Sequence, residues 1–265
     1  MDFSSEEKCQ TQQQIESLAP GVPAYKLTNA CLDNRYRIEK EVLANPKRDV
    51  VLQRTHFTPL QGSLEDYHLN VELAPHLGNE GSNNTAWIRD YKGVPMLFAE
   101  RQGVALALAC SAPWLNYSAG FVGTSDGWQD LNLNKKLTLT YARTENGNVA
   151  LTGEIDLQIS GGDFVLALGF GSNSFEAGQR ELSSLLDGFE NARSVYLHEW
   201  QNWLQSLHPL SSIVNNKESQ ELYLVSAAVM RTHESKRFPG ALIASLSIPR
   251  GFSKGNDDLG GYHLS

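Results

Sequence analysis

The chain contains two short runs that are apolar at almost every position, Val104-Ala105-Leu106-Ala107-Leu108-Ala109-Cys110 and Phe164-Val165-Leu166-Ala167-Leu168-Gly169-Phe170. Successive side chains of a β-strand point to opposite faces, so a run that is apolar throughout is buried on both sides. We therefore predict that these two runs are central strands of a β-sheet that is covered on both faces.

The segments around these runs alternate between apolar and polar residues, as strands do when only one of their faces is buried. This alternation covers residues 36–42, 67–73 and 155–159, where Ile155, Leu157 and Ile159 supply the apolar positions. Glycine and asparagine residues separate the segments at short intervals. The pattern predicts that residues 20–172 are almost entirely antiparallel strands and that they form a sandwich.

One turn has a strong local signal. Asn146-Gly147 lies between residues 137–141 and residues 149–152, and both residues tolerate a positive φ angle. We predict a β-hairpin that joins these two flanking segments.

Beyond residue 175 the periodicity becomes helical. Between residues 176 and 207 there is no proline, and glycine occurs at Gly178 and Gly188. Apolar residues recur at steps of three, four and seven, which predicts one long helix that packs four residues inward: Leu185, Phe189, Trp200 and Trp203. The same stripe includes Leu182, Leu186, Tyr196 and Leu207.

A second helix is predicted over residues 217–236, with Leu222, Val225 and Val229 on its buried face. Ala227-Ala228 would permit close approach of a neighbouring element. The rest of the chain offers few apolar partners to cover this helix, whereas a helical domain normally contains more helices. The sequence therefore predicts a sandwich followed by the first helices of a larger structure.

Composition excludes several classes of protein. The net charge is −8 over 265 residues, whereas nucleic-acid binding requires a basic face. No run of 18 apolar residues occurs, so we expect no membrane span, and the acidic N-terminus shows no signal peptide, which favours a cytoplasmic location.

Three widely spaced cysteines (Cys9, Cys31 and Cys110) predict reduced thiols, with Cys110 in the core, and no metal or cofactor is expected.

Two polar loops are candidate binding sites. Trp128 lies in the turn Ser125-Asp126-Gly127-Trp128-Gln129-Asp130, where its ring could stack on a sugar or, more commonly, plug the rim of the sandwich. Asp257 and Asp258 follow Asn256 in a glycine-rich loop and could bind a cation or a sugar hydroxyl, or cap the loop through Asx turns.

Several segments resemble the N-terminal domain of bacterial glucoamylases and glucodextranases, which are family 15 glycoside hydrolases. They are residues 35–57, 72–79, 84–98 and 121–131. The stretch Thr232-His233-Glu234 and residues 238–249 look like the opening of that family's catalytic domain. The resemblance covers nearly the whole chain.

The resemblance implies a mainly β fold. Its parts are a large antiparallel β-sandwich (a mutarotase-like super-sandwich), a linker helix and the first helix of an incomplete (α/α)6 barrel. On this reading residues 1–174 form the sandwich, residues 175–212 the linker helix and residues 213–265 the start of the barrel. The chain then looks truncated at both ends.

The resemblance also implies a glucoamylase-like hydrolase of the glucan 1,4-α-glucosidase type, which inverts the anomeric centre. Inversion needs a general acid and a general base about 6.5–9.5 Å apart, and the family carries both in the barrel. No residue of this chain matches their motifs, so none is assigned as catalytic and the chain is expected to be inactive alone. Glu218, Glu221 and Glu234 are expected to be structural or solvated carboxylates.

By the spacing of the family's glucose-binding segment, Tyr262 would line the first sugar subsite, with His263 a weaker candidate. The implied partners are an α-glucan or oligosaccharide and the barrel segment as a separate chain. The alternative is a non-catalytic module that binds carbohydrate or scaffolds a partner. The sequence does not choose among α-1,4 glucans, α-1,6 glucans and trehalose.

Overall fold

The computed structural model describes residues 3–209, 216–235, 238 and 240–242, and these residues fall into two compact units. The first unit contains residues 3–16 and 24–196. The second contains residues 17–23 together with the described residues from 197 onward. The boundary lies within one helix, α5, and the two units are described separately below.

The larger sheet of the first unit has nine strands in the order β1-β2-β3-β4-β12-β8-β7-β6-β10. From β2 to β10 each neighbouring pair runs antiparallel. The strands are β1 (Thr11–Ser17), β2 (Tyr25–Cys31), β3 (Tyr36–Ala44), β4 (Val50–Pro59), β6 (Asn84–Tyr91), β7 (Val94–Arg101), β8 (Val104–Cys110), β10 (Arg143–Gly147) and β12 (Asp163–Gly171).

A second sheet has three antiparallel strands in the order β5-β11-β9. They are β5 (Leu69–Leu73), β9 (Trp114–Phe121) and β11 (Val149–Ile155). The main hydrophobic core lies between the two sheets, with Ile38, Leu108 and Phe164 from the larger sheet and Leu151 and Ile155 from the smaller one. The sandwich predicted from the alternating pattern is therefore confirmed.

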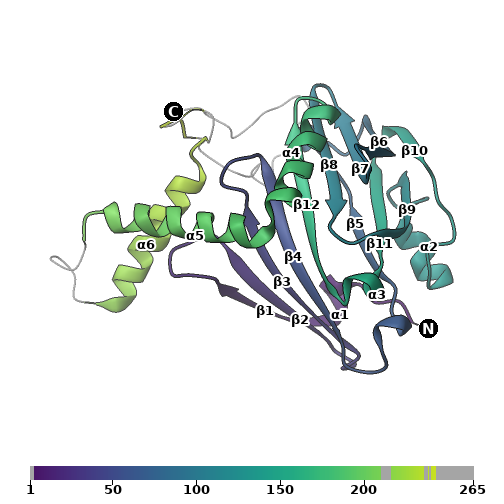
Figure 1. Ribbon diagram of the computed structural model, residues 1–265, viewed down its shortest axis with the longest axis horizontal. Coiled ribbons are helices and arrows are strands. Elements are labelled where there is room, and N and C mark those ends of the chain that lie inside the picture. Colours follow the sequence, from purple (N-terminus) through teal and green to yellow (C-terminus); the bar gives the residue numbers. More distant parts are fainter. Residues whose placement is uncertain (1–2, 210–215, 236–237, 239, 243–265) are drawn as a thin grey trace, which may run out of the picture. The chain divides into compact units, whose positions relative to one another are not determined.

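The two fully apolar runs are confirmed as central strands. They form β8 and β12, which pair with each other in register from Leu166 opposite Cys110 to Gly171 opposite Ala105. One face of this pair contributes to the core between the sheets. On the other face they meet α4 (Ser174–Asp187), as Figure 1 shows.

The other helices of the first unit are short. They are α1 (Glu7–Gln10), α2 (Gly127–Asn134) and α3 (Leu157–Ser160), with single 3-10 turns at Leu64–Asp66 and Leu77–Asn79. Two longer helices, α5 (Phe189–Ser206) and α6 (Lys217–Thr232), complete the chain's described elements.

The predicted strand continuing from Ile155 to Ile159 is wrong. β11 ends at Ile155, and α3 follows, because the Asp156 carboxylate accepts hydrogen bonds from the backbone N–H groups of Gln158 and Ile159. Gly161 then ends the helix with a φ of 61°. Ile159, assigned to the buried face, is 72% exposed.

The predicted hairpin at Asn146-Gly147 is also wrong. Asn146 does adopt a positive φ of 56°. However, β10 before the turn pairs with β6 in the larger sheet, whereas β11 after it pairs with β5 and β9 in the smaller one. The turn therefore carries the chain from one layer of the sandwich to the other.

The single long helix predicted over residues 176–207 is mostly helical but is interrupted. Gly188, with φ 81° and ψ 146°, ends α4, and α5 begins at the next residue. Phe189 and Trp200 are buried as predicted, whereas Leu186 is 78% exposed.

In the second unit, α6 confirms a helix at the predicted place but with a different buried face. Leu222, Val225 and Val229 are each at least 50% exposed, whereas Ala228 is buried. The face that packs also carries Arg231, whose guanidinium carbon lies 4.9 Å from the ring centre of Trp200 and 4.5 Å from that of Trp203. The long arginine side chain thus fills the place that an apolar stripe was expected to fill.

Replacing Arg231 with glutamine is expected to destabilise the second unit by about 1–2 kcal/mol, because a partly desolvated cation–π contact is lost twice. Arg231→Lys should fall between the two, since an ammonium lacks the planar group that stacks on indole. Thermal unfolding followed by tryptophan fluorescence measures the difference. An unchanged midpoint for Arg231→Gln would show that the two indoles do not depend on the cation.

Candidate functional site

Trp128 lies in the first turn of α2, and the preceding polar turn is the N-cap of that helix. The Asp126 carboxylate accepts hydrogen bonds from the backbone N–H groups of Gly123 and Gln129, the latter at 2.9 Å. Asp126 is only 5% exposed. This cap fixes where Trp128 leaves the backbone.

Gly127 allows α2 to lie directly on the smaller sheet. Its backbone N–H donates to the Thr152 Oγ1 at 3.2 Å, and a Cβ added at Gly127 would stand 2.4 Å from that same oxygen. Only glycine fits such an approach. The half-buried Trp128 is thereby held near β5, an outer strand of the smaller sheet, where its backbone N–H donates to Glu72.

A cleft of about 650 Å³ opens beside β5, and we call it the inter-sheet cleft. Among the described residues β5 pairs with β11 alone, so the cleft follows the free edge of the smaller sheet. Its walls come from β3, β4, β5, α2 and the segment Phe3–Lys8. The lining residues that bear on its chemistry are Phe3, Glu6, Glu7, Tyr36, Phe57, Tyr67, His68, Asn70, Glu72, Asp126, Trp128, Gln129 and Lys135.

One end of the inter-sheet cleft is an aromatic cluster. Tyr36 and Phe57 stack with ring centres 5.7 Å apart, and Tyr67 meets Phe57 edge to face at 5.1 Å. The Tyr67 hydroxyl lies 2.6 Å from the carbonyl oxygen of Arg35, and the Tyr36 hydroxyl lies 2.7 Å from the Ser5 Oγ. Both hydroxyl groups are thus engaged, and the rings present apolar surface.

Glu72, near Trp128, is the most perturbed group of the cleft. Glu72 is exposed to solvent, although the walls of the concave cleft partly surround its carboxyl group. Burial raises the pKa of this carboxyl to about 7, and the negative charge of Asp126 acts in the same direction. The backbone N–H of Trp128 opposes this shift. Glu72 therefore carries its proton in a substantial part of the molecules near neutral pH.

Most other charges around the cleft are already engaged within the protein. Glu7 accepts from Lys40 at 2.8 Å and from the Asn29 amide. The Lys135 ammonium donates to the Ser4 Oγ at 3.2 Å and to the Asn132 carbonyl oxygen at 2.6 Å.

His68 is engaged in the same way. Its Nδ1 lies 2.6 Å from an oxygen of the buried Glu154, whose other oxygen accepts from the Asn116 amide at 2.7 Å. Three polar side chains of the lining keep free hydrogen-bonding capacity among the described residues. They are Gln129, Asn70, whose Oδ1 has no partner, and Glu72, whose carboxylate accepts from the Trp128 backbone N–H.

Glu72 and Asp126 of the cleft do not form the acid and base pair of an inverting glycosidase. Glu72 has the raised pKa expected of a general acid, but a base must be free to activate water. Its acidic neighbour Asp126 is buried and holds two backbone N–H groups. Glu72 and Asp126 therefore suit ligand binding better than the paired acid and base of an inverting reaction.

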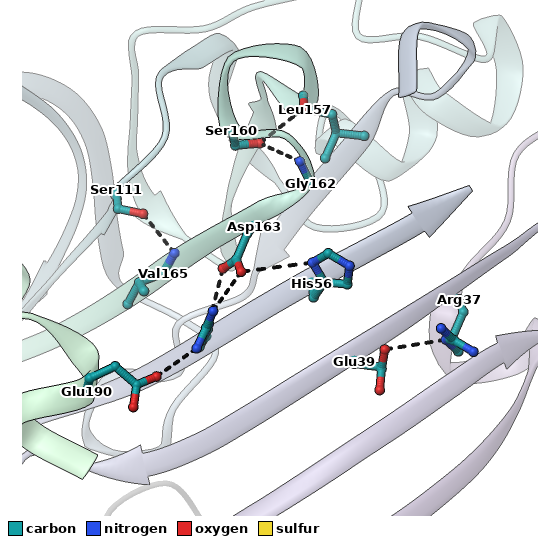
Figure 2. Close-up of polar contacts among 11 residues, drawn as sticks. Arg37, Glu39, His56, Ser111, Leu157, Ser160, Gly162, Asp163, Val165 and Glu190 are labelled. Atoms are coloured by element: carbon teal, nitrogen blue, oxygen red, sulfur yellow. Dashed lines mark hydrogen bonds and ion pairs between the residues drawn. The ribbon is translucent and has the colours of Figure 1, made fainter. Parts of the chain in front are cut away.

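A separate polar cluster lies where β4, β12 and α5 meet. Figure 2 shows Asp163 between His56 and an arginine that also reaches Glu190; this arginine is Arg54. The Arg54 guanidinium donates two hydrogen bonds to Asp163, at 3.1 and 2.7 Å, and one to Glu190 at 2.7 Å. His56 faces Asp163 at 4.0 Å. The charges satisfy one another at the surface, which is typical of a structural ion-pair network.

The remaining sequence-based candidates fall into two groups. Tyr262, His263, Asp257 and Asp258 lie outside the described residues, so their roles stay predictions. Glu218, Glu221 and Glu234 are exposed, and the Glu234 carboxylate accepts from the Gly240 N–H at 2.7 Å.

Three further observations concern the described part of the chain. No three His, Cys, Asp or Glu side chains gather there closely enough to hold a metal ion. No helix in those ranges is both long and apolar enough to cross a membrane. Cys9, Cys31 and Cys110 are free thiols, and Cys110 is buried as predicted.

The fold and the cleft define this chain as an antiparallel β-sandwich domain followed by helices, with a binding-type cleft at the edge of the smaller sheet. The sequence profile described as "Glucodextranase, domain N" matches residues 1–205. The chain therefore belongs to the glucodextranase N-domain family, and the resemblance drawn from residues 35–131 is confirmed.

Two relatives are similar over nearly the whole chain. The glucoamylase of Clostridium sp. (strain G0005) is 34% identical over 262 residues, which are 99% of this chain and 36% of that protein. The crystal structure of a bacterial glucoamylase complexed with acarbose is 32% identical with a TM-score of 0.88, over 98% of this chain and 38% of that one. This chain thus spans little more than a third of either relative.

A more distant structure shares the fold alone. A family 92 inverting mannosidase from Bacteroides thetaiotaomicron has a TM-score of 0.53 at 9% identity, over 83% of this chain and 29% of that one.

Proposed function

We propose that this chain is the non-catalytic N-terminal part of an α-glucan hydrolase of the inverting, glucan 1,4-α-glucosidase type. The observation that carries the proposal is the 34% identity to a glucoamylase over 99% of this chain. The similar crystal structure was solved with acarbose, and on this proposal the ligands of the system are α-glucans. Its chemistry belongs to a helical barrel, which acts either in the same polypeptide or as a separate partner chain.

The inter-sheet cleft supports the non-catalytic part of the proposal. Glu72 is the one carboxyl group there with a raised pKa, and Asp126 is committed to the helix cap. An inverting reaction without its acid and base loses two proton transfers, each contributing about 10²–10⁴-fold to the rate. Tyr262 and His263 remain proposed contacts of the first sugar subsite, to be completed by the barrel.

The purified chain is therefore expected to release no glucose from maltotriose or isomaltotriose above a buffer blank. A chimera of the Clostridium glucoamylase, in which this chain replaces the matching segment, is expected to keep glucose release within about tenfold of the parent, a difference near 1.4 kcal/mol in activation free energy.

Two results would contradict the proposal. Glucose release that copurifies with the isolated chain would place catalytic groups within it, and Asp257 and Asp258 would be the first to replace. A chimera that folds with the parent's helical signal but hydrolyses neither trisaccharide would show that this chain does not serve a glucan hydrolase.

A further inference from the structure

The inter-sheet cleft has the size and shape of a site for an extended ligand. Its volume of about 650 Å³ lies within the range of about 300–1,000 Å³ that small-molecule sites occupy. A second hollow of about 320 Å³ shares Glu7, Ile38, Leu69, Asn70 and Glu72 with it. The two hollows together follow the edge strand β5, so the space is elongated.

The chemistry of the cleft matches an amphipathic and uncharged ligand. Trp128 offers a partly exposed indole, and an aromatic ring of this kind packs well against the C–H face of a pyranose. Glu72 and Gln129 flank it with groups that both donate and accept hydrogen bonds, since the carboxyl of Glu72 is partly protonated near neutral pH. Hydroxyl groups need partners that do both.

The charges around the cleft argue against anionic ligands and metal ions. Its lining carries Glu6, Glu7, Glu72 and Asp126 against Lys8 and Lys135, so an anion would be repelled. Glu7 and Asp126 are already held by Lys40 and by backbone N–H groups, and no described set of three ligands suits a metal ion. A neutral polyhydroxylated molecule fits best.

We propose that the inter-sheet cleft is a saccharide-binding site, in which Trp128 stacks on a sugar ring while Glu72 and Gln129 hydrogen-bond its hydroxyl groups. The site lies in the first unit and contains no residue from 197 onward. The choice of an α-glucan oligosaccharide among neutral saccharides rests on the function proposed above, whereas the site itself rests on the cleft.

The test is calorimetric titration of the whole chain at pH 6.5 with maltotriose, isomaltotriose and cellotriose. We expect maltotriose or isomaltotriose to bind with a dissociation constant near 1 mM or below, a free energy of about −4 kcal/mol. Trp128→Ala should weaken this binding at least about tenfold. Gln129→Ala should weaken it by about three- to tenfold, the range for one hydrogen bond.

Gln129→Ala keeps the inference testable if Trp128→Ala does not fold, because Gln129 is exposed on α2. Gln205→Ala, at an exposed position on α5, is the matched control and is expected to bind as the unaltered chain does. Circular dichroism confirms the fold of each variant.

Each remaining outcome decides a different point. Binding that both cleft variants leave unchanged, or no binding of any trisaccharide, would overturn the site but not the proposed function, which the glucose-release assay and the chimera test independently. Binding of cellotriose alone, lost in Gln129→Ala, would support the site and overturn the α-glucan assignment.

Discussion

Replacing Gly169 with valine is expected to destabilise the first unit by at least about 3 kcal/mol, at the upper end of the cost of overpacking a core. A Cβ at Gly169 would lie 2.6 Å from the carbonyl oxygen of Ala177 and 2.8 Å from the Cβ of Glu181. Both residues belong to α4, and a backbone oxygen cannot rotate away. The helix would have to move off the sheet.

The size of the effect follows from what α4 covers. A second core cluster lies between this helix and strands β7 and β8, formed by Met96, Phe98, Ala105, Ala107, Ala109 and Ala177, all at most 2% exposed. Because the alanine residues of β8 and Gly169 of β12 have small side chains or none, α4 can lie close to the sheet. Shifting α4 would open that cluster to water, and burial of apolar area is the main source of stability.

Denaturant unfolding of the purified variant measures this loss. Gly103→Asn is the matched control, because Gly103 has a φ of 81° that asparagine tolerates and no atom lies within 4 Å of its would-be Cβ. It is expected to change the unfolding free energy by less than about 1 kcal/mol. A Gly169→Val chain as stable as the control would show that α4 does not rest on β12.

The same region shows what the sequence could predict of the fold. The runs that form β8 and β12 were identified as central strands, because apolar residues on both faces require cover on both faces. The alternation did not reveal where Asn146-Gly147 leads. The turn geometry at Asn146 is local, whereas the choice of partner strand depends on contacts far along the chain.

The helices show the same division. Their positions followed from periodicity, but the buried face of α6 did not. The pattern favours Leu222, Val225 and Val229, whereas the described packing uses Ala228 and the guanidinium of Arg231, which lies over two indoles. A charged residue that packs through cation–π contacts is invisible to a count of apolar positions.

For the inter-sheet cleft, the sequence pointed to Trp128 and missed Glu72. Trp128 stood out because it interrupts a polar turn. The alternating pattern assigns Glu72 to the solvent-exposed face of a strand. Its raised pKa arises only once α2 has packed on the smaller sheet and brought Asp126 near it. Such a perturbation comes from tertiary packing, so no local pattern signals it.

The sequence pattern also gave no sign that Glu181 is buried. This burial affects the free energy of unfolding more than the raised pKa of Glu72 does. It lies on α4 one turn after Ala177, is 0% exposed, and neither carboxyl oxygen has a hydrogen-bond partner among the described residues. Burial raises the pKa of this carboxyl from its ordinary 4.5 to about 8. The acid is therefore neutral in the folded protein at pH 7 and ionised in the unfolded chain.

The sign of the resulting pH dependence follows from proton counting. Between pH 4.5 and 8 the folded state holds a proton on Glu181 that the unfolded state has lost, so unfolding becomes easier as the pH rises. The contribution is fully present below pH 4.5 and is lost as the pH passes through about 8. The gap between the two pKa values corresponds to on the order of 4–5 kcal/mol.

Glu181→Gln is therefore expected to match the unaltered chain near pH 5 and to exceed its stability by several kcal/mol near pH 9, because the amide is never ionised. Glu181→Met should be at least as stable at both values, since an apolar side chain of similar length leaves no buried polar atom unpaired. Denaturant unfolding at pH 5, 7 and 9 gives the three differences, with Glu199→Gln, at an exposed position on α5, as the control for the substitution itself. If Glu181→Gln differed from the unaltered chain by the same amount at pH 5 and pH 9, Glu181 would have to be ionised in the fold. A partner for its charge would then have to exist against α4, where the described residues place none.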